Sequence, residues 1–151
     1  MDKVNPTGTG YFSLNRNTDH TPGEYSVAIG HETTASGARS YAEGSRTTAS
    51  GERSHSEGSR TTASGYCSHA EGCDTTASGD RSHVEGNDTI ASGYCSHAEG
   101  SHNTASGAYS HAEGYRTIAS RDYAHAEGRS SVASGHSSHV EGYQTIANHR
   151  A

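Results

Sequence analysis

Residues 65–78 read G-Y-C-S-H-A-E-G-C-D-T-T-A-S, and this 14-residue unit recurs nine times without insertion or deletion between Gly23 and Asn148. A short fixed period is typical of a stack of near-identical units, in which each unit packs on its neighbours and not on one central core. The repeat therefore predicts a solenoid. We expect its function to belong to a repeated surface, because no unit differs enough to form a unique pocket.

The composition fits a thin solenoid better than a globule. Leu, Ile, Val and Phe together supply 11 of 151 residues, Trp is absent, and the net charge is −6. In a chain without a repeat, so few apolar residues would indicate disorder. Here they recur at fixed positions, and a solenoid can order such a chain through small inward side chains and backbone hydrogen bonds between rungs.

Each unit divides into two related halves, G-x-x-S-H-A-E and G-x-x-T-T-A-S, which predict two short strands joined at corners that begin with Gly. Glycine at a corner allows backbone angles that other residues resist. Side chains alternate along a strand, so Ser68 and Ala70 share one face, and His69 and Glu71 share the other. The two strands leave room only for small groups between them. The Ser/Ala and first-Thr/Ala faces are therefore expected inside, and the second Thr, such as Thr76, outside.

The first repeat contains Ser26-Val27-Ala28-Ile29-Gly30, and the SHAEG and TTASG segments keep the same 14-residue frame through residues 23–148. Over this span the chain resembles the YadA-like head repeats (Hep_Hag type) of trimeric autotransporter adhesins. The resemblance implies a left-handed parallel β-roll with two strands per coil, assembled as a homotrimer with the Val/Ile face toward the three-fold axis. It also implies a non-enzymatic adhesin. SHAEG-type repeats resemble those of phage or prophage structural proteins as well.

The chain departs from that family on the face that the resemblance assigns to the trimer interface. After the first repeat, the Val position holds Tyr41 and then seven His, and the Ile position holds eight Glu. The resemblance thus implies an interface made of Val27, Ile29, Tyr41, Glu43, His55, Glu57, His69, Glu71, His83, Glu85, His97, Glu99, His111, Glu113, His125, Glu127, His139 and Glu141.

Several roles are open for these His and Glu columns. They could hydrogen-bond between chains in layers, or they could simply meet solvent. Three His at one level of a three-fold axis could also bind Zn, Ni or Cu, but rungs about 4.8 Å apart could not all hold divalent ions. We expect no cofactor and no metal. An enzyme is not expected, because Ser68 and His69 point to opposite faces and the imidazole cannot take the serine proton.

The same repeat pattern argues against ice binding and nucleic-acid binding. Ice binding would need a regular Thr array, but the outward column mixes Thr with Ile and Val. Nucleic acid is not an expected partner, because 11 basic and 17 acidic residues form no basic stripe. The variable corners, such as Tyr66-Cys67 and Tyr115-Arg116, carry residue types that are common in recognition. A cell-surface, matrix or glycan receptor could bind there, or the rod could be a structural spacer in a fibre.

The two ends lie outside the repeat. Residues 1–22 hold Val4, Tyr11, Phe12 and Leu14, and are predicted to cap the first rung, because an open strand edge recruits other chains. Residues 149–151 form a tail, beyond which the natural protein is expected to continue. The sequence shows no signal peptide and no stretch suited to membrane insertion. We expect the segment to be displayed on a cell surface or virion.

Overall fold

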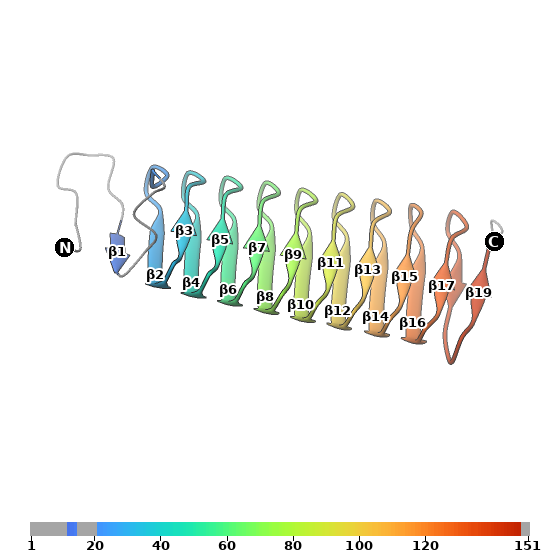
Figure 1. The fold of residues 1–151 in the computed structure, drawn as a ribbon. Coiled ribbons are helices and arrows are strands. Elements are labelled where there is room, and N and C mark those ends of the chain that lie inside the picture. The colour runs from blue at the N-terminus through green and yellow to red at the C-terminus, as the bar shows by residue number, and fades with distance from the viewer. Residues whose placement is uncertain (1–11, 15–20, 149–151) are drawn as a thin grey trace.

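A computed structural model describes the backbone of residues 12–14 and all of residues 21–148. In this part of the chain the regular secondary structure is entirely β-strand, and the rungs follow one another in a single row from the N-terminal to the C-terminal end (Figure 1). The predicted all-β parallel solenoid with nine 14-residue coils is confirmed.

The longer strands form one parallel sheet, here called the long-strand sheet. It contains, in spatial order, β1 (Phe12–Leu14), β2 (Val27–His31), β4 (Tyr41–Ser45), β6 (His55–Ser59), β8 (His69–Cys73), β10 (His83–Asn87), β12 (His97–Ser101), β14 (His111–Tyr115), β16 (His125–Arg129) and β18 (His139–Val140).

The two-residue strands form a second parallel sheet, here called the short-strand sheet. It contains β3 (Thr34–Ala35), β5 (Thr48–Ala49), β7 (Thr62–Ala63), β9 (Thr76–Ala77), β11 (Ile90–Ala91), β13 (Thr104–Ala105), β15 (Ile118–Ala119), β17 (Val132–Ala133) and β19 (Ile146–Ala147). Each rung supplies one strand to each sheet, and the narrow interior lies between the two sheets (Figure 1).

Equivalent residues of successive rungs lie directly beside one another. His83 pairs with His97 and Glu85 with Glu99 across β10 and β12, and Ile90 pairs with Thr104 across β11 and β13. The pairing offset equals the repeat length, so every position of the 14-residue unit forms a straight column along the rod. This register follows from a repeat without insertions, since one extra residue would turn a strand's inward face outward.

The interior is built from columns of small side chains, as the alternation predicts. The Ala of the short strands is buried in the rungs from Ala35 to Ala133, and the Ala of the long strands gives way only to Ser56, Val84 and Val140, which are also buried. Ser68 and Thr75 lie inside as well, with 1% and 0% of their surface exposed. The core is therefore only one side chain deep, and its stability depends on close packing and on the backbone ladders.

The corner between the first Gly and the Ser of each unit, here called the first corner, is closed by that Ser. The backbone N–H of Ser68 donates to the carbonyl of Gly65 at 3.2 Å, and its hydroxyl donates to the same carbonyl at 2.8 Å. The residue before it, Cys67, has a positive φ of 54° and donates its N–H to the carbonyl of Glu52 in the preceding rung at 2.9 Å. Bonds to the neighbouring rung thus hold a strained backbone at each corner.

Glycine occupies its two columns for different physical reasons. Only the second column has the special backbone angles that the sequence predicts. The second Gly of each unit, such as Gly72, has a φ of 98–124°. The first Gly has no positive φ, so the prediction of special backbone angles is wrong there. This column is a place of close approach, because a Cβ on Gly65 would lie 2.1 Å from the carbonyl oxygen of Gly79, and Gly occupies it in every unit but one, where Arg121 stands. The left-handed conformation at the first corner is instead adopted by the third residue of each unit, which is never Gly.

Asn103 is a buried exception in the first-Thr column. Its side-chain NH₂ donates to the carbonyl of Gly114 at 2.7 Å and to that of Glu99. Its side-chain oxygen accepts from the Thr117 N–H at 2.8 Å and from the Thr117 hydroxyl at 2.9 Å. The amide therefore finds partners in two neighbouring rungs, which satisfies the hydrogen-bonding groups of a fully buried polar side chain.

The N-terminal cap remains a prediction, since most of residues 1–22 lie outside the described residues. β1 does pair in parallel with β2, with Phe12 opposite Val27 and Leu14 opposite Ile29. This strand covers the first edge of the long-strand sheet, as a cap would. The predicted tail, residues 149–151, lies outside the described residues.

Replacing Gly72 with Ala should destabilise the rod more than the same change at Gly142. Both glycines have positive φ, 110° and 104°. A Cβ on Gly72 would lie 2.1 Å from the Gly86 carbonyl oxygen, whereas the nearest atom to a Cβ on Gly142 is 3.8 Å away. We expect G72A to lower the free energy of unfolding by about 2–4 kcal/mol, from backbone strain plus the clash, and G142A by about 1–2 kcal/mol, from strain alone.

Guanidinium unfolding followed by circular dichroism measures both variants. Equal losses would show that the contact between rungs is not what requires Gly in this column.

Candidate functional site

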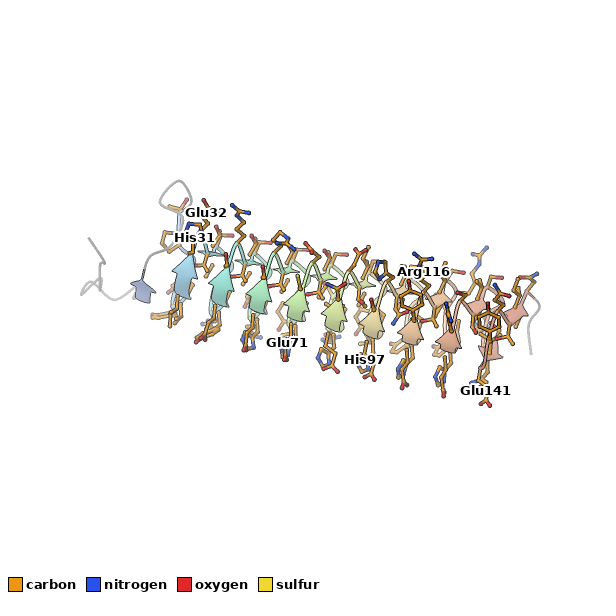
Figure 2. The ribbon with its side chains drawn as sticks, turned by 60° about the horizontal axis from the view of Figure 1, so that its bottom comes forward. His31, Glu32, Glu71, His97, Arg116 and Glu141 are labelled. Atoms are coloured by element: carbon orange, nitrogen blue, oxygen red, sulfur yellow. The ribbon has the colours of Figure 1, made fainter. Side chains whose placement is uncertain are left out.

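The outward side of the long-strand sheet carries one continuous array of imidazoles and carboxylates. We call it the His–Glu face. It consists of the fifth and seventh residues of each unit: Val27, Ile29, Tyr41, Glu43, and then the His and Glu columns from His55 to Glu141. In Figure 2, Glu71, His97 and Glu141 project from the same side of the strands, and Glu32 and Arg116 project from the other side. The fold thus brings every residue predicted for an interface onto one surface.

Imidazole rings follow one another along the rod at the rung spacing, and most neighbouring pairs are stacked, whereas His125 and His139 meet edge-on. Ring centroids from His55 to His139 are 4.6–4.8 Å apart in every successive pair. The rings of His83 and His97 are nearly parallel, at an interplanar angle of 2°. Register alone imposes this arrangement, because identical residues occupy identical positions in adjacent parallel strands.

Each His lies beside the Glu of its own strand. The Nε2 atom of each column His is 3.6–3.9 Å from a carboxylate oxygen two residues later, from His55–Glu57 to His139–Glu141. These distances allow electrostatic attraction but exceed a normal hydrogen bond. The pairing predicted between chains therefore has a weaker counterpart within one chain.

The imidazole Nε2 atoms are the most unusual polar atoms of the face. In His55, His69, His83, His97, His111 and His125 this atom is shielded from solvent and has no hydrogen-bond partner in the described chain. The side chains as wholes remain between 35% and 43% exposed. A buried polar atom without a partner is costly, so the face has a row of unfilled hydrogen-bonding positions.

Burial and like neighbours make the column reluctant to take up protons. The pKa values of His69, His97 and His125 are lowered below the ordinary 6.5, first by partial burial and then by the adjacent imidazoles. The neighbouring carboxylates raise these pKa values, but by less. Near neutral pH these three imidazoles of a single chain are therefore mostly neutral.

The N-terminal end of the face is less charged. Val27 and Ile29 are only half-buried although they are apolar. In the next rung, the Tyr41 hydroxyl donates to a Glu43 carboxylate oxygen at 2.6 Å, and this hydrogen bond raises the pKa of Tyr41. The Tyr41 ring meets His55 edge-on, with centroids 5.1 Å apart. One apolar rung and one Tyr–Glu rung thus precede the His–Glu rungs.

The described residues form neither a metal-binding cluster nor a serine–histidine pair from Ser68 and His69. No group of three or more His, Cys, Asp or Glu side chains within residues 21–148 is placed to hold one metal ion. The Ser68 hydroxyl is buried and bonded to the Gly65 carbonyl, whereas His69 lies on the outer face. A serine–histidine pair is therefore not formed.

The first corners form a ladder of aromatic and charged side chains along one edge. Arg81 lies between two rings, with its guanidinium carbon 6.0 Å from the Tyr66 centroid and 5.4 Å from the Tyr94 centroid. Farther along, Tyr94 meets Tyr109 edge-on at 5.5 Å, and Tyr109 stacks on Tyr123 at 5.2 Å. The sequence pointed to these corners as recognition surfaces, but it did not reveal that their side chains contact one another between rungs.

The opposite edge holds ion pairs between successive rungs, at the ninth and tenth residues of each unit, here called the second corner. Arg46 Nε donates to Glu32 at 2.8 Å, and Arg60 forms two bonds of 2.5 Å with Asp74. The bonds from Arg60 lower the pKa of Asp74. Glu32 and Arg116 mark this edge in Figure 2. Unlike the uniform His and Glu columns, the column of tenth residues mixes acidic, basic and neutral side chains.

Comparison with known families matches the YadA head domain repeat to residues 22–40, 42–66, 70–94 and 126–148. These segments make up more than half of the sequence. The chain belongs to the YadA head domain repeat family. Residues between the matched segments keep the same rung register in the structure, as the pairing of β12 with β14 shows. The repeat family and the solenoid are of a structural, adhesin type.

A comparison with curated proteins finds no match. Among the residues that the structure describes, no helix is long and apolar enough to cross a membrane.

At concentrations where the chain is monomeric, the imidazoles of His69, His97 and His125 should titrate below pH 6.5, because burial and neighbouring imidazoles lower their pKa. The folded chain then binds fewer protons than the unfolded chain in this range. Its stability is therefore complete above about pH 6.5 and declines as the pH falls toward the folded pKa values.

Proton–nitrogen NMR of the imidazoles measures these midpoints. His102→Asn and His136→Asn variants simplify assignment, because both residues lie at the corners and not in the column. Midpoints at or above 6.5 would contradict the shielding of the column.

Proposed function

We propose that the chain is a non-enzymatic fibre segment that assembles as a homotrimer through the His–Glu face and serves in attachment at a cell surface or virion. The observation that carries this proposal is the row of shielded Nε2 atoms without partners, lying on the face where the family resemblance places the three-fold axis. Their own chain covers these atoms, so rotation of the rings on assembly would turn them toward carboxylates of adjacent chains, which would then accept hydrogen bonds from them. The half-buried Val27 and Ile29 would supply a short apolar contact at one end.

Register supports this arrangement. The His column is paired in every step from β6 to β18, so three rods meeting on this face would match rung for rung. A polar interface of this kind specifies alignment, because a shift by one rung at the Val27–Tyr41 end would place apolar side chains against carboxylates. The rungs of Val27 and Tyr41 would therefore fix which rungs face one another, because the His–Glu layers beyond them are all alike.

Sedimentation equilibrium at about neutral pH should give three times the chain mass of 15.7 kDa, with or without a metal chelator. His83→Glu combined with His97→Glu should abolish the trimer, because it adds like charges to the shared face. Ser64→Glu combined with Ser78→Glu is the matched control, since these exposed side chains follow the short strands. The control should remain trimeric. A monomeric wild-type chain, or a trimer that tolerates charge on the His–Glu face, would contradict the assembly.

A structural spacer without receptor binding is the second candidate. The ladder of the first corners favours a spacer. Arg81 and its Tyr neighbours contact one another there and so cover part of the surface that a receptor would bind. An attachment segment should bind an immobilised matrix protein, glycan or cell wall as an isolated trimer. A spacer of equal stability should bind none of them.

A further inference from the structure

The charge of the His–Glu face creates a problem for assembly. Eight Glu and seven His occupy it, and its two columns contain no Lys or Arg. Partial burial and like neighbours lower the pKa values of His69, His97 and His125, so these three rings supply little positive charge to offset the carboxylates of a single chain at pH 7. Three such faces would place three carboxylates around a shared axis at eight of the nine rungs, and like charges in close proximity are repulsive.

We propose that assembly through the His–Glu face takes up protons onto the imidazole column, so that proton concentration regulates the trimer. This inference rests on the proposed trimer and concerns the control of that assembly. An imidazolium donates from both ring nitrogens, whereas a neutral imidazole donates from one. Protonation would thus give the shielded Nε2 atoms a hydrogen to donate to a carboxylate. In a single chain these atoms lie 3.6–3.9 Å from a carboxylate oxygen of the same strand, too far for a normal hydrogen bond.

The groups that face a column imidazole on the sheet are few. His69 has His55 and His83 on either side, and it lies near Glu71 of its own strand and Glu57 of the preceding rung. The N-terminal end of the column meets Tyr41, whose hydroxyl is bonded to Glu43. In a single chain the like-charged imidazoles oppose protonation. Carboxylates brought by two more chains would favour it.

Stacking limits how many protons one column can take. Adjacent imidazolium rings 4.6–4.8 Å apart would repel one another, so neighbouring rungs of one chain should not all be charged together. Charge would instead be distributed over alternate rungs, or over different chains at one level. The column is therefore expected to take up protons over a wide pH range and not in one sharp step.

The sign of the effect follows from linkage. If the assembled state binds more protons than the separate chains, the association constant rises as the pH falls. Uptake of one proton per trimer corresponds to about a tenfold increase per pH unit. The increase should reverse below about pH 4.3, where Glu itself becomes protonated and can no longer pair with an imidazolium.

The test is sedimentation equilibrium of the full chain at constant ionic strength, with a chelator, from about pH 8 to about pH 5.5. We expect the association constant to rise at least about tenfold per unit of falling pH. His69→Asn, His83→Asn and His97→Asn together should make this dependence shallower. His102→Asn with His136→Asn is the control that removes imidazoles from the corners, and it should leave the dependence unchanged.

The outcomes separate the two proposals. A trimer whose association constant does not change with pH, or changes equally in both variants, overturns proton-linked assembly and leaves the trimer intact. No trimer at any pH overturns both. A trimer too tight to dissociate on dilution is tested by NMR titration of its imidazoles. Midpoints above those of a single chain, such as the His83→Glu and His97→Glu variant provides, support proton uptake on assembly, and equal or lower midpoints overturn the proposal.

Discussion

Stacking of backbone upon backbone at one strand spacing is the constraint on which the rest of this structure depends. Each rung hydrogen-bonds to the next through both sheets and both corners, as in the bond from the Thr62 N–H to the Thr75 carbonyl at 2.9 Å. Gly65 and Gly72 allow approaches that a Cβ would obstruct at about 2.1 Å from a neighbouring carbonyl oxygen. Small interior residues and a strict repeat length are direct consequences of this close stacking.

Close stacking also places identical residues beside one another. The chain accommodates these like neighbours differently in its interior, at its corners and on the His–Glu face. Inside, a column of Ala has no conflict, because methyl groups pack well on one another. At the corners the sequence varies from rung to rung, so that Arg46 meets Glu32 and Arg60 meets Asp74. Only the His–Glu face keeps its charge uniform. Repulsion between like neighbours destabilises that face in a single chain. We therefore connect the His–Glu face with assembly and with the uptake of protons.

Much of the fold is predictable from the sequence, because a 14-residue period and side-chain alternation decide which residues point inward. Ser68, Ala70 and Thr75 are buried as expected, and His69 and Glu71 share the outer surface. The positive φ of corner residues such as Cys67 was not predictable from residue type, since hydrogen bonds between rungs hold it in place. The network of Asn103 was equally hidden, because most of its partners, on Gly114 and Thr117, lie 11 and 14 residues away.

The candidate site, like the fold, is only partly predictable from the sequence. Register allowed the stacked columns to be predicted, but the shielding of Nε2 and the pairing of each His with its own Glu depend on side-chain rotation that no spacing reveals.

Which surface lies opposite the His–Glu face depends on how several chains assemble. The measurement that tests it most directly is pulsed dipolar spectroscopy, with one spin label per chain and Cys67, Cys73 and Cys95 replaced by Ser. A label at His139→Cys should report a short distance between chains, and a label at Ser78→Cys a longer one. Absence of dipolar coupling between chains, or a shorter distance at Ser78, would contradict an axis on the His–Glu face.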